Sequence, residues 1–463
     1  MGRAVRGVYS SDVLYDEALL LKPTGEMIRM REFAFEDLSA EEFDSFSAVH
    51  PQGNFQQTSR MAEVRRKDGT EVQFVGVREN GSLVAATELE IHRGRLSTFA
   101  EIHDGPLCDL HDEELTSALF EELKKRSRSA GAAQLAITPE LPFEVHDSFG
   151  ASLPAADDAW PENVPAGVPT GADQAAFDAI CALGFVHSGF DHDYNAVPRW
   201  RYVKDLTPYQ SRKALLDSYA KNTRRNVRIA ENSFVRVERV DRDGLSTFHD
   251  ICELSAEKQG FDNRPLAYFE QLYDCLGDVA TFYVAFFDAR ANLSSWEQKR
   301  DGFEADIARL EHNLAEGRSP ERTERQLKDA RSKLEASLKR IEEARAFISE
   351  DGEKIPAAAA LFVDHPRERV YLFSGSDPKY AKFYAATAIQ HRAMCDCLDK
   401  GITRYNFYGI NGVFDDPADP GRGLLEFKQG FNGYVEEMMG SFTLPVKPLS
   451  YAIKQLAHKV LGR

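Results

Sequence analysis

The segment between Leu293 and Ile348 carries the apolar spacing of two helices that pack against each other. Its apolar residues recur at intervals of three, four or seven, which places one apolar stripe along each helix. The positions on the first helix are Phe303, Ile307, Leu310 and Leu314, and the matching positions on the second are Leu327, Leu334, Leu338, Ile341, Arg345 and Ile348. The pattern predicts an antiparallel coiled-coil hairpin, and at about 1.5 Å per residue its helices reach roughly 35 to 45 Å.

The turn of this hairpin falls between Glu316 and Pro320. Gly317 can end the first helix, and Ser319 and Pro320 can start the second as its N-cap and first helical residue. Strand-like sequences flank the hairpin at residues 281–289 and 356–364. We therefore expect an arm that is inserted within a sheet.

Length and composition indicate a globular protein with more than one core. The chain has 463 residues, 43% hydrophobic and 28% charged, and domains average about 100–200 residues. The sequence contains neither an apolar run of about 20 residues nor a secretory signal. Its six cysteines do not form a disulfide framework. We expect a cytoplasmic protein.

The net charge of −17 excludes binding to nucleic acid through bulk electrostatics. We expect no DNA partner, and any RNA partner needs a local basic patch.

The predicted elements follow the same order twice. An antiparallel meander, with a hairpin turn at Asn80 and Gly81, precedes a helix over 112–130 and a strand over 133–138. After Trp200, strands at 281–289, 356–364 and 369–375 precede a helix over 380–400 and a strand over 404–410, and a last strand is expected over 435–446. This repetition predicts an α/β protein of the α+β type with two acetyltransferase-like (GNAT-like) lobes.

The expected boundaries follow from this order. They are a flexible extension at 1–26, a first lobe at 27–199, a second lobe at 200–290 and 351–446, the arm at 291–350, and a C-terminal helix at 447–463.

Several kinds of site lack their sequence signals. There is no Walker loop, no G-x-G-x-x-G after a strand, no G-x-S-x-G elbow and no paired C-x-x-C. Neither lobe has the Gly-rich pyrophosphate loop expected of an acetyl-CoA enzyme. Cys395 and Cys397 point about 200° apart on a helix and cannot easily share an ion. The cluster formed by His187, Asp191, His192 and Asp193 is typical of an acidic loop, so we expect no metal.

Lys428 is the strongest chemical candidate. It lies between Phe427 and Phe431 in a segment that Gly430 and Gly433 bound. A lysine beside aromatic rings can be partly desolvated while it stays cationic, which suits it to neutralise a developing oxyanion.

Two further groups have both a functional and a structural interpretation. A basic stripe on a predicted helix suits a phosphate-bearing ligand or an RNA backbone, but is equally typical of a solvated helix face. The stripe consists of Lys221, Arg224, Arg225 and Arg228. Arg264 and Tyr268 are four residues apart and share a face if their segment is helical.

From Met27 to its C-terminus, the chain resembles the FemABX family of peptidoglycan bridge-forming aminoacyltransferases, which includes the MurM-type enzymes. The segments that carry the resemblance are FQQTSRMAEVR (55–65), FAEIHDGPLCD (99–109), VPRWRYVKDL (197–206), KNTRRNVRIA (221–230), FDNRPLAYF (261–269) and the long block from 375 to 433 that contains LLEFKQGFNG. The resemblance implies two GNAT-like domains that act without coenzyme A, the second of which carries a coiled-coil arm in many members.

The resemblance also implies roles for residues of the catalytic centre. The lysine of the F-K motif, here Lys428, stabilises the tetrahedral intermediate, and Phe427 positions the amine through its backbone. Asp109 matches an acidic residue that has been considered for catalysis.

Other matched positions imply binding of the precursor. Arg264 and Tyr268 match an Arg and a Tyr that hold its phosphate-sugar end, and Tyr380 best matches a further Tyr. Family members often have tryptophan and lysine in one N-terminal motif where this chain has Met61 and Arg65. Arg65 can still bind phosphate, with a different geometry.

The function implied is transfer of an amino acid from aminoacyl-tRNA to the side-chain amine of the third stem-peptide residue, Lys or Orn, of lipid II or UDP-MurNAc-pentapeptide. No cofactor is expected, since the aminoacyl-tRNA is the co-substrate. A precursor of this kind would bring the protein into transient contact with the inner face of the membrane. The alternatives are a divergent acyl-CoA N-acyltransferase and a non-catalytic family member that uses its arm for binding.

Overall fold

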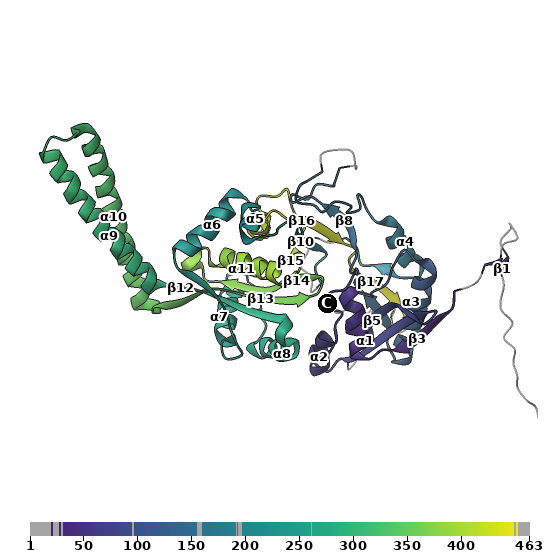
Figure 1. Ribbon diagram of the computed structural model, residues 1–463. Coiled ribbons are helices and arrows are strands. Elements are labelled where there is room, and N and C mark those ends of the chain that lie inside the picture. The colour runs from purple at the N-terminus through teal and green to yellow at the C-terminus, as the bar shows by residue number, and fades with distance from the viewer. Residues whose placement is uncertain are drawn as a thin grey trace, which may run out of the picture.

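The computed structural model describes residues 20–21, 27–28, 31–94, 97–154, 160–190, 192, 197–260, 262–448 and 451. The described chain forms two large β-sheets covered by helices and a separate pair of short strands, β1 (Leu20–Leu21) and β2 (Met27–Ile28), and a long helical arm projects from one end (Figure 1). The expected extension at 1–26 and the expected C-terminal helix at 447–463 lie largely outside these residues. In the part that the structure describes, no helix is long and apolar enough to span a bilayer.

The first sheet has seven strands. In sheet order they are β3 (Phe33–Asp37), β4 (Glu71–Glu79), β5 (Ser82–Arg93), β6 (Thr98–Ile102), β7 (Gln134–Ile137), β17 (Phe442–Pro445) and β9 (Val186–His187). The predicted hairpin turn joins β4 to β5, with positive φ angles at both Asn80 and Gly81. Helices α3 (Glu113–Ser129) and α4 (Gln174–Ala182) cover one face, and α1 (Ala40–Val49) and α2 (Ser59–Lys67) lie on the other.

The second sheet has eight strands. In sheet order they are β11 (Val235–Arg239), β12 (Ala280–Asp288), β13 (Lys354–His365), β14 (Glu368–Ser376), β15 (Arg404–Ile410), β10 (Trp200–Asp205), β16 (Tyr434–Met438) and β8 (Pro142–His146). The helices around it are α5 (Arg212–Asp217), α6 (Lys221–Asn232), α7 (Leu245–Gln259), α8 (Leu266–Leu276), α11 (Ala385–Lys400) and α12 (Arg422–Gln429), with 3₁₀ turns η1 (Gly277–Val279) and η2 (Pro378–Phe383). Helices α6 and α11 pack on one face, and α7 and α8 pack on the other.

The two sheets repeat one topology. Strands β4, β5 and β6 form an antiparallel meander, and α3 leads to the parallel strand β7. Strands β12, β13 and β14 form the equivalent meander, and α11 leads to the parallel strand β15. The prediction of two GNAT-like lobes is confirmed. In the second lobe, β14 and β15 pair only from Arg369 to Val370 and then separate.

The lobes exchange strands, which the sequence did not indicate. β8 follows the elements of the first lobe but pairs with β16 in the second sheet. The single strand predicted at 435–446 is wrong. It is two strands, since Gly440 has a φ of 80° and the chain leaves the second sheet there to enter the first as β17.

Buried ion pairs fill the region between the lobes. The Arg201 guanidinium contacts Glu140 and lies 2.7 Å from the Asp104 carboxylate of the first lobe. Arg404 binds Glu368 at 2.8 Å and Glu436 at 2.6 Å. Removing one member of such a pair leaves an uncompensated buried charge. The Arg201 pair therefore helps to fix how the lobes meet, whereas the Arg404 pairs join strands of the second sheet.

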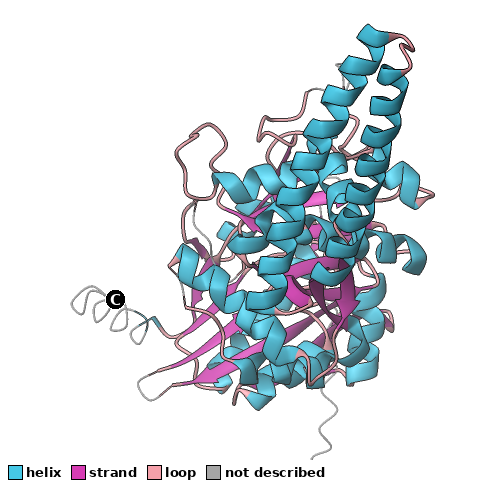
Figure 2. Cartoon of the chain, turned by 90° about the vertical axis from the view of Figure 1, so that its left-hand side faces the viewer, coloured by secondary structure: helices cyan, strands magenta, loops and turns pink. Residues whose placement is uncertain are grey.

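The predicted arm is present as α9 (Ala289–Ala315) and α10 (Pro320–Asp351), which rise side by side from the body (Figure 2). The buried residues of α10 alternate in size, and they are Thr323, Leu327, Ala330, Ser337, Ile341 and Ala344. Two stripe positions are wrong: Leu338 is 43% exposed, and Arg345 forms a surface ion pair with Glu297. Ser319 and Pro320 start α10 as expected, although the Ser319 side chain makes no capping hydrogen bond.

Candidate active site

Lys428 lies at the end of α12 with only 2% of its surface exposed. Its Nζ donates to the carbonyl oxygen of Gly409 at 2.6 Å and contacts that of Tyr408 at 3.4 Å. Burial lowers the pKa of Lys428 to about 7. The sequence indicated a desolvated lysine, and the structure adds that two backbone carbonyl groups hold its ammonium group.

Hydrogen bonds on several sides hold the turn that follows Lys428. Gly430 accepts a hydrogen bond from the Ala220 amide at 3.0 Å, and the Gln429 side chain donates to Ser148 at 2.8 Å. A Cβ atom at Gly430 would overlap the Thr223 hydroxyl. The position of Lys428 is therefore set by its surroundings.

Lys204, which the sequence did not single out, also holds this turn. Its Nζ donates to the Asn432 carbonyl at 3.1 Å and to the Tyr209 hydroxyl at 3.2 Å. The side chain is buried, and burial lowers its pKa to about 7. Lys204 lies in the segment VPRWRYVKDL, but a lysine within a strand pattern is typical of a solvent-facing position, so the sequence predicts no role for it.

Tyr408 connects Lys428 to the first lobe. It stands in β15, beyond the point where β14 and β15 separate, with a φ of 61° that is unusual for a bulky residue. Burial raises the pKa of its hydroxyl, and a hydrogen bond with the Gln56 side chain opposes that shift. The Gln56 side chain also accepts from Arg65 at 2.7 Å. A chain of polar contacts thus runs from Lys428 to Arg65.

Arg65 is buried and already paired. It lies 2.8 Å from Glu88 and 2.9 Å from Glu90. Burial raises the pKa of Glu88 to about 8, and its Oε2 atom has no hydrogen-bond partner among the described residues. A phosphate contact by Arg65 would have to compete with these carboxylates, and its role stays a prediction.

Arg264 and Tyr268 lie together, although Arg264 precedes α8. The guanidinium carbon stands 5.3 Å from the centroid of the Tyr268 ring. Helix α8 packs beside α2, where Gln271 donates to the Val64 carbonyl at 3.0 Å (Figure 1). Burial raises the pKa of Tyr268, while Arg264 and Arg65 oppose that rise. The structure thus gathers three of the four predicted precursor-binding residues.

Tyr380 and Asp109 lie elsewhere. Tyr380 is buried at the root of the arm, where its hydroxyl donates to Asp351 and its ring centroid is 5.2 Å from that of Phe347. Asp109 is exposed and lies 3.4 Å from the His111 ring. Neither residue contacts Lys428 in this conformation, and their assigned roles stay predictions.

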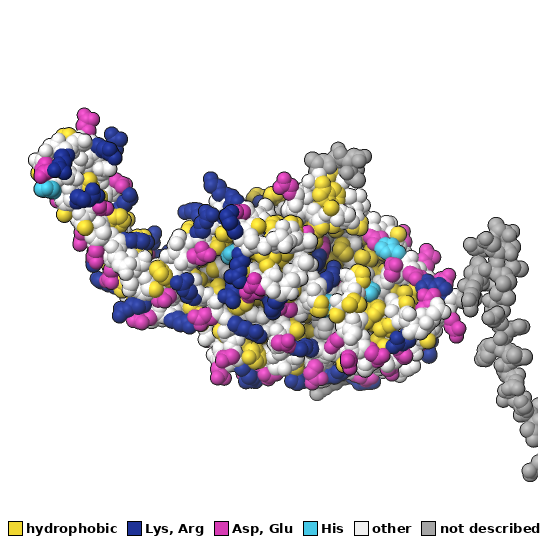
Figure 3. All heavy atoms as spheres, in the orientation of Figure 1, with side chains coloured by type: hydrophobic (Ala, Val, Ile, Leu, Met, Phe, Trp, Pro, Cys, Tyr) yellow, Lys and Arg dark blue, Asp and Glu magenta, His cyan; other side chains and the backbone are white. Residues whose placement is uncertain are grey.

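The predicted basic stripe lies on α6. Lys221, Arg225 and Arg228 are exposed, and Arg224 donates to the Asp217 carbonyl at 2.7 Å. Lys and Arg side chains gather over α5 and α6 in Figure 3. Because Ala220 binds Gly430, this surface begins beside the turn that carries Lys428.

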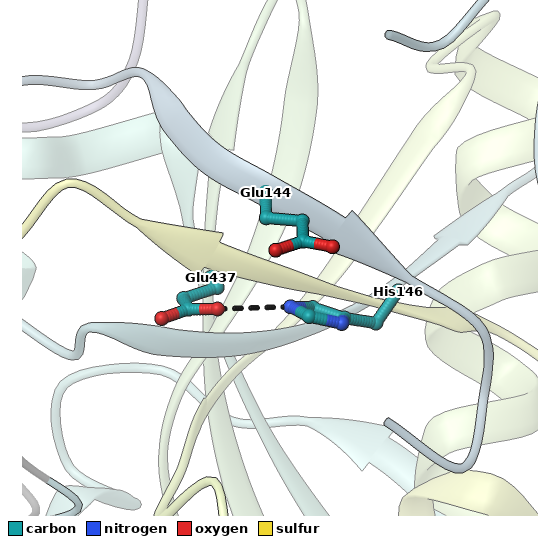
Figure 4. Close-up of side chains that lie close together, drawn as sticks. All are labelled: Glu144, His146 and Glu437. Atoms are coloured by element: carbon teal, nitrogen blue, oxygen red, sulfur yellow. Dashed lines mark hydrogen bonds and ion pairs between the residues drawn. The ribbon is translucent and has the colours of Figure 1, made fainter. Parts of the chain in front are cut away.

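One group of possible metal ligands lies on β8 and β16. Glu144, His146 and Glu437 offer atoms within 4.8 Å of one another, and His146 Nε2 is 2.9 Å from Glu437 (Figure 4). Arg199 also pairs with Glu437. The buried Nδ1 of His146 has no partner among the described residues, whereas a ligating histidine usually donates from its second nitrogen. This arrangement suits an ion-pair network.

Residues 38–459 match the FemAB family. The chain belongs to the FemAB family. A relative in Staphylococcus aureus (strain bovine RF122 / ET3-1), aminoacyltransferase FemA, is 26% identical over 437 residues, which cover 93% of this chain and 99% of FemA. The prediction that this protein is an aminoacyltransferase is confirmed.

The solved structure of FemX supports the fold of this FemAB protein. The crystal structure of FemX aligns with a TM-score of 0.72 and 23% identity, and the alignment covers 91% of this chain and 99% of FemX. A tandem GNAT protein from the clavulanic acid biosynthesis pathway aligns with a TM-score of 0.45 and 12% identity, covering 90% of this chain and 99% of that one.

Proposed function

We propose that this FemAB protein transfers an amino acid from aminoacyl-tRNA to the side-chain amine of the third stem-peptide residue, Lys or Orn, of a peptidoglycan precursor. The acceptor is lipid II or UDP-MurNAc-pentapeptide, and the product carries the first part of an interpeptide bridge. The observation that carries the proposal is the buried Lys428, held by carbonyl groups beside a turn that several contacts fix in place.

Ester aminolysis needs a free amine, close approach to the carbonyl and a counter-charge for the oxyanion. Alignment of the reactants can supply about 7 to 11 kcal/mol of barrier lowering, and one charged donor about 3 to 4 kcal/mol. Lys428 is the donor in this scheme. Oxyanion formation beside it favours its protonated state, since an opposite charge nearby raises the pKa of a lysine.

Arg264, Tyr268 and Arg65 would receive the phosphate-sugar end of the precursor. They lie where α2 of the first lobe meets α8 of the second, and the polar chain through Gln56 leads from there to Lys428. We place the protein in the cytoplasm, with transient contact at the inner membrane face when the acceptor is lipid-linked. The reaction as written needs no cofactor.

The residues before the helices that follow the two meanders argue against the acyl-CoA alternative. In acetyltransferase-like lobes, a helix N-terminus there would have to bind a pyrophosphate. Helix α3 instead begins with Asp112, Glu113 and Glu114, and the Asp112 carboxylate caps the Leu115 amide. In the second lobe, the Asp377 carboxylate caps the 3₁₀ turn η2 that precedes α11 and accepts from the Lys379 amide at 2.8 Å. The carboxylates at the start of α3 repel an anionic ligand.

A co-substrate experiment tests the proposal. The purified protein is incubated with precursor and a labelled amino acid supplied either as aminoacyl-tRNA or as an acyl-CoA, with an RNase-treated sample as the control. We expect transfer from aminoacyl-tRNA alone, and its loss after RNase treatment. Transfer from acyl-CoA without RNA would establish the alternative enzyme. Binding of both precursor and tRNA without any transfer would establish the non-catalytic alternative.

A further inference from the structure

A groove of about 360 Å³ opens at the root of the arm, where the end of α6 meets α9, α10 and η2. Asn232 of α6 and Asn292 of α9 line it on one side. Trp296, Phe347 and Phe383 supply aromatic surface. The groove is therefore concave, aromatic and bordered by side-chain amides.

Two lysines of the groove stand against its rings. The Lys299 Nζ atom lies 4.1 Å from the centroid of Trp296. Lys382 lies 4.9 Å from the Phe347 centroid and 5.1 Å from that of Phe383. Aromatic faces stack on nucleobases of any sequence, and cations beside them bind phosphates, which is the combination found in proteins that bind single-stranded nucleic acid.

The charge of the groove is positive in a strongly acidic protein. Arg340 binds Glu343 at 3.0 Å, and Lys382 pairs with the same carboxylate. Lys299 has no acidic partner among the described residues. Three cations therefore face a single carboxylate, and this local patch can attract a polyanion although the whole chain carries −17.

Helix α6 connects this groove with the catalytic turn. Its first turn follows Ala220, whose amide binds Gly430, and its last turn contributes Asn232 to the groove. Lys221, Arg225, Arg228 and Asn232 follow the spacing i, i+4, i+7 and i+11, so they share one helix face. Twelve residues span about 18 Å, or roughly five phosphate intervals of stacked single strand.

We propose that the root groove and the basic face of α6 together bind the single-stranded 3′ end of the RNA co-substrate. Bases stack against Trp296 and Phe347, phosphates follow α6, and the esterified terminus reaches Lys428. This inference rests on the proposed function. It assigns RNA recognition to the root of the arm, and the distal half of the arm is not needed for it.

The test measures binding of two acceptor-stem minihelices, one with a single-stranded 3′ overhang and one blunt. The variants are Trp296→Leu, which removes a stacking ring, and Lys299→Ala, which removes an exposed cation. Lys328→Ala, in the exposed distal part of α10, makes the same charge change and serves as the matched control. Melting temperatures establish that each variant is folded, and Lys299→Ala keeps the test valid should Trp296→Leu destabilise the arm.

We expect native protein to prefer the overhang RNA. Trp296→Leu should weaken its binding by about fivefold or more and leave blunt RNA unchanged, because stacking of one base accounts for such a factor. Lys299→Ala should reduce the slope of log K against log salt by about 0.7. Lys328→Ala should bind as native protein does.

Unchanged overhang binding in both groove variants would overturn the inference, and aminoacyl transfer by the same preparations would show that the proposed function still holds. Equal loss of binding to anionic vesicles and to RNA would overturn the assignment to RNA. Absence of aminoacyl transfer in the native protein, by contrast, would reject the proposed function itself.

Discussion

Replacing Lys428 by methionine removes its positive charge. Replacing it by arginine keeps a positive charge that does not change with pH in the working range. Arg201, the cation over the Tyr408 ring, is bound to Asp104 and Glu140 and so cannot replace the charge of Lys428. Loss of one preorganised donor typically costs about 10²- to 10³-fold in rate, or about 3 to 4 kcal/mol. We expect Lys428→Met to lower kcat by this factor and the exposed control Lys213→Met to retain native kcat.

The pH dependence sharpens this prediction. Transfer requires an unprotonated acceptor amine, whose pKa is about 10.4 for lysine, and a protonated Lys428, whose pKa is about 7. Below pH 7 the reactive fraction grows about tenfold per pH unit, and above pH 7 the two changes cancel. The native enzyme should therefore reach a plateau in kcat/KM near pH 7. Lys428→Arg, always cationic, should continue to rise through that pH if it retains activity.

Initial rates of labelled transfer at saturating aminoacyl-tRNA, between about pH 6 and 8.5, provide the measurement. A break near pH 7 that persists in Lys428→Arg would assign the pKa to another group. Activity of Lys428→Met within about threefold of native would refute the oxyanion role, because that difference is below 1 kcal/mol.

Three further outcomes follow from the structure. Lowering the pKa of Lys428 from 10.5 to about 7 corresponds to about 5 kcal/mol against its charged form. The unfolded chain binds this proton between pH 7 and 10 and the native protein does not, so native stability should rise with pH across that window, and Lys428→Met should flatten this slope in urea titrations. Gly430→Ala should reduce transfer by about tenfold or more, since small misplacements of catalytic groups cost such factors; native kcat in this variant would show that the turn tolerates a Cβ atom. In the arm, Ile341→Ala should lower the free energy of unfolding by about 2 to 4 kcal/mol, because Ile341 is buried. Leu338→Ala should lower it by less than about 0.5 kcal/mol, because Leu338 is exposed. Equal effects of the two substitutions would contradict the observed packing of α9 against α10.

The arm shows how far an apolar pattern predicts structure. Its two facing helices follow from the heptad spacing, and its turn follows from Gly317, Ser319 and Pro320. The seam itself was partly misassigned, because Ala330, Ser337 and Ala344 are small residues that an apolar pattern does not mark. Ser337 is buried in the structure, and its neighbour Leu338 is exposed.

The exchange of strands between the lobes was not predictable from local pattern. In the sequence, Gly440 is typical of an interior residue of a single strand. The strand pairing shows that the chain changes sheets there, at a positive φ angle. Long-range pairing of β8 with β16 depends on register across about 290 residues of sequence, as the His146 and Glu437 pair illustrates. Local periodicity carries no information about such a partner.

At the active site, the sequence identifies the residue whose neighbours along the chain form a motif. It does not identify residues whose properties depend on contacts with distant segments. Lys428 stood out through its flanking aromatic residues and glycines. Lys204 and Glu88 lie in ordinary strand patterns, and their shifted pKa values arise from burial by distant segments. Tyr380 was assigned by its position in a motif, and the structure places it at the arm root.

The most direct test of the central claim is the position of the new bond. The native protein is incubated with aminoacyl-tRNA and UDP-MurNAc-pentapeptide, and the product is fragmented by tandem mass spectrometry. A precursor whose third residue is acetylated on its side-chain amine is the matched control. The account predicts one added aminoacyl group on the side-chain amine of the third residue, and none on the acetylated control. Addition at any other position, or to the acetylated precursor, would contradict it.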